Sequence, residues 1–242
     1  MAEARTYRRW VEAGDLVAFN VTVRETDLHI RASADLSKEA LRAVKKYRAI
    51  LEIYIKRHPQ FLTSLKPVAV ASDAPEMVAA MSRAAERVGV GPMATVAGAI
   101  AEFVGQDLLA FSPEVIVENG GDIYLKSLRE RVVAIYAGRS PLTGKIGLKV
   151  KAAATPLGIC TSSGTVGHSL SYGQADAAVV LAESASLADA AATAIGNRVV
   201  NADDIPRAIE FAQTIGDLVG VVIVKDDRVG AWGGVELCQL SV

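Results

Sequence analysis

A chain of 242 residues with a formal net charge of −1 is long enough to bury a large core, and its composition is typical of a soluble globular protein. The balanced charge argues against a nucleic-acid partner, and no run of about 18 apolar residues is present to span a membrane. The charged first residues lack the apolar stretch of a signal peptide, so we expect a cytoplasmic protein with no membrane partner.

The N-terminal quarter predicts a β-hairpin followed by a surface helix. Residues 16–23 and 27–32 alternate apolar and polar side chains, and residues 37–57 carry an apolar stripe opposite a basic face. His29 falls on the polar side of its strand, where a solvent-facing role is expected. We expect residues 1–70 to form a hairpin-plus-helix part of a single domain that spans residues 1–242.

Two helices should follow. The first begins with a carboxylate cap at Asp73 and ends before Gly89. The second, over residues 93–104, is rich in alanine and glycine and apolar on nearly every face, which indicates a buried helix. Its N-terminal N–H groups are a potential anion site, although every buried helix has such an end. The residues at that end are Met93, Ala94 and Thr95.

Strands at 115–118 and 123–125 flank the segment Asn119-Gly120-Gly121-Asp122. One interpretation is a simple hairpin turn, for which Asn-Gly is a strong signal. The other is a ligand site, because paired glycines let a phosphate or a ring approach the backbone. The two interpretations are compatible.

A further strand ends in hydroxyl side chains and a glycine, namely Thr161, Ser162, Ser163 and Gly164. Cys160, in the apolar part of this strand, is expected to be a buried and unreactive thiol. His168 titrates near neutral pH and is the best candidate for a general acid or base, with Asp176 as the second. The alternatives are structural roles, for His168 in a glycine-rich loop and for Asp176 at the entry to the next strand.

An apolar strand at 177–181 leads into a helix that is expected to begin after Ser186 and to end at Gly196. Asp189 and Thr193 lie one turn apart on this helix and offer two oxygen ligands to Mg²⁺. Alternatively, Asp189 closes a capping box with Ser186, and Thr193 bonds to a carbonyl one turn earlier. Spacing alone favours the capping box, because a Mg²⁺ site needs more than two ligands.

A helix from residue 203 to about 215 and a hairpin of residues 219–224 with 235–240 should complete the chain. Strands, hairpins and buried helices in this order predict an α+β fold with mostly antiparallel sheets.

The segment Leu187-Ala188-Asp189-Ala190-Ala191-Ala192-Thr193-Ala194 resembles the C-terminal signature of the ApbE-type flavin transferase superfamily, which includes thiamine biosynthesis ApbE-like proteins. The Gly120-Gly121 turn, the strand end at 161–164 and His168 have counterparts in that superfamily, and residues 91–94 loosely match its glycine turn. The resemblance covers roughly residues 85–240 and is closest to an ApbE-related family of uncharacterised proteins. It implies an ApbE-like, T-fold-like architecture with Asp189 and Thr193 as Mg²⁺ ligands.

The resemblance implies that FAD is the substrate or ligand and that the reaction is Mg²⁺-dependent FMN transfer to an acceptor protein, or pyrophosphate cleavage. His168 is then the catalytic residue. The expected cofactor-binding residues are Met93, Ala94, Thr95, Asn119, Gly120, Gly121, Asp122, Thr161, Ser162, Ser163 and Gly164.

The chain departs from the superfamily pattern after Gly164, where an insertion and an Asp-Pro-x-Thr-Gly element are missing. Two further hypotheses therefore stay open. One is a non-catalytic protein that binds a flavin or another nucleotide. The other is a homo-oligomeric structural protein in which the alanine-rich helices serve packing only.

Overall fold

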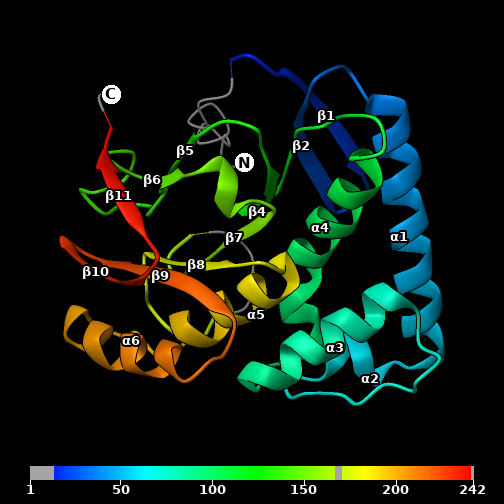
Figure 1. Ribbon diagram of the computed structural model, residues 1–242. Coiled ribbons are helices and arrows are strands. Elements are labelled where there is room, and N and C mark those ends of the chain that lie inside the picture. Colours follow the sequence, from blue (N-terminus) through cyan, green and yellow to red (C-terminus); the bar gives the residue numbers. More distant parts are fainter. Residues whose placement is uncertain (1–13, 167–170, 241–242) are drawn as a thin grey trace.

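The computed structural model describes residues 14–166 and 171–240. Its main feature is an eight-stranded sheet with the order β1-β2-β3-β4-β7-β8-β9-β10 (Figure 1). The strands of this sheet are β1 Val17–Val23, β2 Thr26–Ala32, β3 Val115–Asn119, β4 Asp122–Lys126, β7 Leu157–Ser162, β8 Ala177–Ala182, β9 Leu218–Lys225 and β10 Arg228–Gly233.

A second sheet has the order β11-β6-β5, and every described strand pair in both sheets is antiparallel. Its strands are β5 Arg131–Ala134, β6 Ile146–Val150 and β11 Glu236–Gln239. The helices are α1 Ser37–Arg57, α2 Gln60–Thr63, α3 Glu76–Val88, α4 Val96–Leu108, α5 Ala185–Gly196 and α6 Ile205–Gln213, with 3₁₀ turns η2 Pro92–Thr95, η3 Ala152–Ala154 and η4 Ala202–Asp204.

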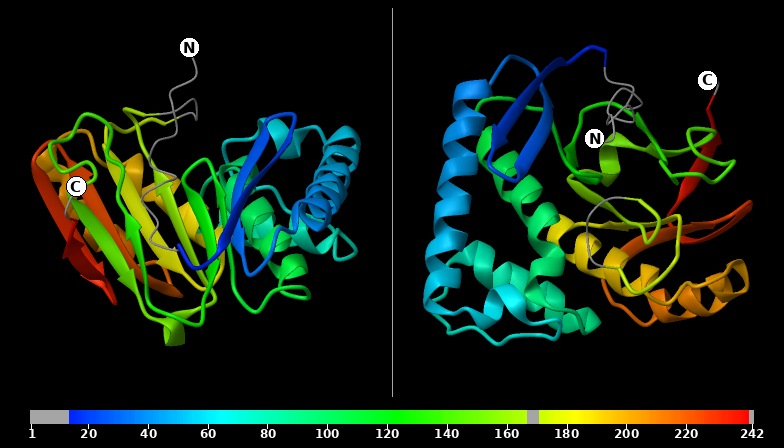
Figure 2. Two further views of the ribbon diagram at one scale, coloured as in Figure 1. Left: turned by 90° about the horizontal axis from the view of Figure 1, so that it is seen from above. Right: turned by 180° about the vertical axis from the view of Figure 1, so that it is seen from behind.

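The central strands are covered on both faces. In β8, Ala178 and Val180 belong to the hydrophobic cluster formed with the helices. Val179 and Leu181 belong to a second cluster, formed with the three-stranded sheet. Because side chains alternate along a strand and both faces are buried, β8 is apolar at every position. Figure 2 shows the helices gathered on one side of the main sheet.

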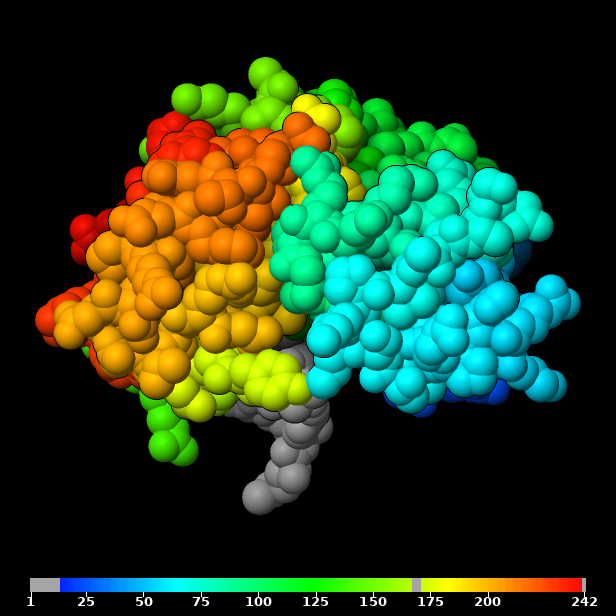
Figure 3. Space-filling model, turned by 90° about the horizontal axis from the view of Figure 1, so that it is seen from below, coloured from blue at the N-terminus to red at the C-terminus, as the bar shows by residue number. Residues whose placement is uncertain are grey.

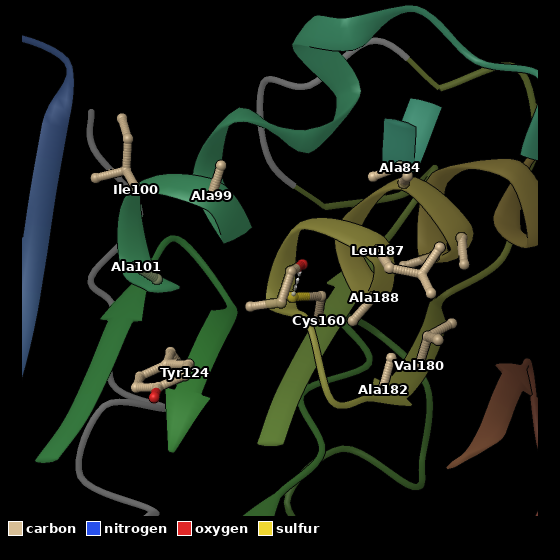
Figure 4. Packing of buried hydrophobic residues seen from close by; sticks show 14 of the residues in the cluster. Ala84, Ala99, Ile100, Ala101, Tyr124, Cys160, Val180, Ala182, Leu187 and Ala188 are labelled. Carbon is tan, nitrogen blue, oxygen red and sulfur yellow. Dashed lines mark hydrogen bonds between the residues drawn. The ribbon is translucent and has the colours of Figure 1, made fainter. Parts of the chain in front are cut away.

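Helix α5 lies very close to its neighbours. A Cβ added at Gly158 of β7 would lie 2.4 Å from the Cα of Ala185, so the helix begins directly against the strand. Cys160 is buried beneath this helix, beside Leu187 and Ala188 (Figure 4), and its Sγ donates to the Ala185 carbonyl oxygen at 3.3 Å. The expected burial of Cys160 is therefore observed. Small side chains allow this close packing.

The N-terminal part is attached to the rest of the molecule in two ways. The hairpin β1–β2 extends the main sheet because β2 pairs with β3. Helix α1 packs on α4, where the rings of Tyr47 and Phe103 meet edge to face with centroids 5.4 Å apart. In Figure 3 the segment with α2 (cyan) and the segment with α6 (orange) occupy opposite sides of one face.

The structure confirms the α+β class and the antiparallel sheets, and it corrects several details. Helix α3 begins at Glu76 with Pro75 at its N-cap position, so Asp73 does not cap it. The segment expected as one helix from residue 93 is a 3₁₀ turn followed by α4. The last strand does not pair with β9, because the chain turns at Gly233, with φ +85°, and β11 joins β6 in the other sheet.

No single helix among residues 14–166 and 171–240 has the length and apolar character needed to cross a membrane. Helix α3 and the segment Pro92–Leu108 meet that requirement only when taken together, and they are bent by 105° at the break between them.

Candidate functional site

A cavity of about 920 Å³ lies where β3, β4 and β7 meet the ends of α4 and α5. Four segments that the sequence singled out contribute to its lining. They are the turn Asn119, Gly120, Gly121 and Asp122; the strand end Thr161, Ser162 and Ser163; the α5 residues Asp189 and Thr193; and Met93 and Ala94 of η2. Residues far apart in the sequence are therefore brought to one place.

The cavity has walls of two kinds. Its apolar wall extends between the two sheets and consists of Ile116, Ile123, Val133, Ile135, Leu148, Ile159 and Val179. Its polar wall holds the turn, the hydroxyl side chains and the carboxylates of Asp122 and Asp189. A cavity of this volume with a few convergent polar groups suits a ligand that combines an apolar ring with charged groups.

The turn between β3 and β4 is a hairpin that also faces the cavity. Gly120 and Gly121 have φ angles of +67° and +106°, which glycine adopts readily. Asn119 Nδ2 donates to the Ala97 carbonyl oxygen at 3.1 Å, and the Gly121 N–H donates to Glu118 Oε1 at 2.9 Å. The hairpin turn is therefore fixed to the N-terminal end of α4.

Asp189 does not close a capping box with Ser186. Its Oδ2 accepts from the Gly98 N–H at 2.9 Å, in the first turn of α4. The Ser186 N–H donates instead to Glu102 Oε2 at 3.0 Å. The N-cap of α5 is Ser184, whose side chain accepts from the Leu187 N–H. The expected N-cap at Ser186 was wrong because Ser184 caps the helix two residues earlier, and the capping box is missing because the Ser186 N–H donates to Glu102, which is distant in sequence.

Burial dominates the electrostatics of the polar wall. It raises the pKa of Asp189 to about 7. Burial and then the charge of Asp189 raise the pKa of Asp122 well above its ordinary value. Burial and then the charge of Asp122 raise the pKa of the Cys160 thiol, which fits an unreactive cysteine. The two carboxyl groups and the thiol therefore lie close enough together for the charge of one to affect the ionisation of another.

Two expected site residues, Thr95 and Gly164, do not line the cavity. Thr95 is buried, and its Oγ1 donates to the Pro92 carbonyl oxygen at 2.7 Å, so it does not line the described cavity. Gly164 does not line it either. A Cβ there would lie 2.0 Å from the Gly173 carbonyl oxygen, so the close approach of the two backbone segments explains why a glycine is needed at this position. His168 lies outside the described residues, and its proposed role stays a prediction.

Asp176, the second acid–base candidate, is held in structural contacts. Its Oδ1 accepts from Thr165 Oγ1 at 2.9 Å, and its Oδ2 accepts from the Asp226 N–H at 2.7 Å. It does not line the described part of the cavity.

Sequence reasoning did not find His29 and Arg31, which line the cavity. His29 Nδ1 lies 2.8 Å from Asn20 Oδ1, and Arg31 Nε donates to His29 Nε2 at 3.4 Å. Burial and then the charge of Arg131 lower the pKa of Arg31. Alternation along β2 placed both side chains on one face, but only the pairing of β2 with β3 brings that face to the cavity.

Residues 8–223 match the family model described as AbpE bacteria. The chain belongs to this family. A UPF0280 protein of Methanopyrus kandleri is 46% identical over 226 residues, which cover 90% of this chain and 91% of that protein. A UPF0280 protein of Methanococcus aeolicus is 43% identical over 219 residues, which cover 88% of each chain.

The AbpE-family chain also shares its fold with a solved flavinyl transferase. The apo form of ApbE from Pseudomonas stutzeri superposes with a TM-score of 0.57 at 14% identity, covering 90% of this chain and 94% of that one. The resemblance predicted from the sequence, including the ApbE-like α+β architecture, is confirmed.

Among residues 14–166 and 171–240 of the AbpE-family chain, no three or more His, Cys, Asp or Glu side chains are grouped to hold a metal. Asp189 and Thr193 nevertheless both line the cavity from successive turns of α5. Mg²⁺ prefers oxygen ligands and commonly binds through one or two carboxylates together with substrate phosphates. The residues present fit Mg²⁺ when a phosphate ligand completes its coordination.

Proposed function

We propose that this chain binds FAD in the cavity, with Mg²⁺ held by Asp189 and Thr193, and acts in FMN transfer to an acceptor protein or in cleavage of the pyrophosphate. The observation that supports this proposal is the meeting of the glycine turn, the hydroxyl strand end and the Asp189–Thr193 face of α5 around one cavity of about 920 Å³.

Each wall has a role in the proposed complex. The apolar wall between the sheets, with Ile123 and Ile159, suits the flavin ring because it removes apolar surface from water. The Gly120-Gly121 turn lets phosphate oxygens approach the backbone, since no side chain intervenes. The hydroxyls of Thr161, Ser162 and Ser163 can donate hydrogen bonds to polar groups of the ligand. Bound Mg²⁺ would neutralise negative charge on the pyrophosphate.

One specific observation favours a second candidate, a protein that binds the flavin nucleotide without transferring it. The connection from Gly164 to β8 is short and lacks the insertion and the Asp-Pro-x-Thr-Gly element expected of a transferase. Binding requires the cavity only, whereas transfer requires in addition a base that activates the acceptor hydroxyl. We propose His168 for that base. The cytoplasmic location of the protein stays a prediction.

Isothermal titration of the purified protein with FAD, with and without Mg²⁺, tests the proposal. We expect Mg²⁺ to strengthen FAD binding and the Asp189→Asn variant to lose at least about tenfold of the Mg²⁺-dependent affinity. An asparagine retains an oxygen that can accept from the Gly98 N–H, so the fold should survive. ADP and FMN serve as comparison ligands.

The matched control is Asp203→Asn, because Asp203 is exposed, pairs with Arg228 and does not line the cavity. It should bind FAD as the parent protein does. An Asp189→Asn variant with parental Mg²⁺-dependent affinity would contradict the metal assignment, and a parent protein that binds no FAD would contradict the proposed function as a whole.

A further inference from the structure

Helices α4 and α5 are joined by reciprocal hydrogen bonds, in which a carboxylate of each helix accepts from the N-terminal end of the other. Asp189 of α5 accepts from the Gly98 N–H in the first turn of α4. Glu102 of α4 in return receives three hydrogen bonds at Oε2, from the Ser186 N–H at 3.0 Å, Ser186 Oγ at 3.1 Å and Ser184 Oγ at 3.0 Å. Each helix therefore supplies a carboxyl group that accepts hydrogen bonds at the N-terminal end of the other helix.

The two contacts lie on one face of α4. Gly98 and Glu102 are four residues apart, so the Gly98 Cα and the Glu102 side chain lie on the same side of the helix in successive turns. At Gly98 the helices touch, because an added Cβ would lie 2.3 Å from the Ala185 carbonyl oxygen and 2.8 Å from the Asp189 Cβ. The position of the first turn of α5 therefore sets the position of Asp189, one turn further along the same helix.

We propose that Glu102 is a positioning residue, which fixes the first turn of α5 on α4 and thereby directs Asp189 and Thr193 into the cavity. Glu102 itself does not line the described part of the cavity, so it acts through α5 and not by contact with a ligand. The functional consequence of this inference rests on the proposed Mg²⁺ site, whereas its structural consequence can be measured without any ligand.

The Gly98 amide is a direct reporter of where Asp189 lies, because its N–H donates to Oδ2 of that carboxylate. In a ¹⁵N–¹H spectrum, the Asp189→Asn variant shows how this cross-peak responds when the carboxylate is replaced. We expect Glu102→Ala to shift the Gly98 cross-peak and to accelerate the hydrogen exchange of that amide. Glu102→Gln should restore it in part, since the glutamine oxygen still accepts from the Ser186 N–H.

The matched control is Phe103→Leu, which weakens the packing of α4 on Tyr47 of α1 and leaves the α5 side of the helix intact. A loss of overall stability alone would affect this control as well as the glutamate variants. We expect Phe103→Leu to leave the Gly98 cross-peak in place at a temperature where Phe103→Leu and the two Glu102 variants are all folded.

The functional readout is the affinity for FAD in the presence of Mg²⁺. We expect Glu102→Ala to reduce it about tenfold, as loss of a partner that orients a metal ligand commonly does, and Phe103→Leu to leave it unchanged. A Gly98 amide that is identical in Glu102→Ala and the parent protein would overturn the positioning role. If the parent binds no FAD, the proposed function fails, and the Gly98 amide still decides the role of Glu102.

Discussion

Gly120 and Gly121 occupy the same turn and carry different backbone constraints. Both have positive φ angles, +67° and +106°, and a Cβ added at either would meet no atom within 4 Å. Steric contact with the rest of the molecule therefore does not distinguish them. The angle at Gly120 lies near the left-handed region that other residues enter at a cost, whereas the angle at Gly121 lies outside it.

We expect Gly121→Ala to reduce the free energy of unfolding by about 2 kcal/mol and Gly120→Ala by about 1 kcal/mol, because only the backbone strain differs. Urea denaturation of the two variants checks this order. Equal losses would show that the turn relaxes to accommodate a side chain at Gly121.

At the scale of the elements, alanine is abundant in α5 because the helix is covered on several sides. It contacts β7, β8, α3 and α4, and its buried residues include Ala188, Ala191 and Ala192. Small side chains bring the backbones of α4 and α5 together at Gly98. This closeness lets Asp189 reach the first turn of α4. The small side chains that allow the helices to pack closely therefore also fix the position of Asp189 in the cavity.

We expect Gly98→Ala to cost about 1–3 kcal/mol of stability, since the added methyl group overlaps the Ala185 carbonyl oxygen and the helices must separate. Thermal unfolding followed by circular dichroism measures the loss. Gly14→Ala is the control, because a Cβ there meets nothing within 4 Å. A Gly98→Ala variant as stable as this control would mean that α4 and α5 are not tightly packed at this point.

At the scale of the whole molecule, a buried arginine joins the two sheets. Arg131 of β5 donates to Glu114, which directly precedes β3, at 2.9 Å, and to Asp15 Oδ2 at 3.1 Å. Glu114 also accepts from Ser127 Oγ and the Leu128 N–H. The hydrogen bond from Arg131 is the main cause that lowers the pKa of Asp15 from 3.8 to about 2.

This network predicts a pH dependence of stability. A carboxylate with a lowered pKa in the folded state stabilises the fold above its ordinary pKa, and the contribution is lost as the pH falls through the folded-state value. Asp15→Asn should therefore melt at a lower temperature than the parent at pH 7, and the difference should vanish between about pH 4 and pH 2.

Melting temperatures over this pH range test the prediction, with Asp227→Asn at the exposed β9–β10 turn as the control. A difference between Asp15→Asn and the parent that stays constant down to pH 2 would argue against the ion pair as its source.

The sequence by itself determined the features that depend on neighbouring residues. The period of apolar residues gave the boundaries of α1, and the Asn119–Asp122 segment predicted the β3–β4 hairpin. The spacing of Asp189 and Thr193 placed both on one face of α5, and the resemblance to ApbE-type proteins indicated the fold. Strand periodicity, helix spacing and turn chemistry are local properties, so a single chain is enough to read them.

Only the tertiary structure decided which distant groups meet. Asp189 accepts from the Gly98 N–H of α4 because the glycine lets the two helices pack closely. The Ser186 N–H donates to Glu102, which belongs to another helix. His29 reaches the cavity because β2 pairs with β3, and β11 leaves β9 for β6. These pairings are selected by the burial of both faces of the sheet, a free energy that belongs to the whole molecule. Local spacing can show that a strand is buried, but it does not show which strand it pairs with.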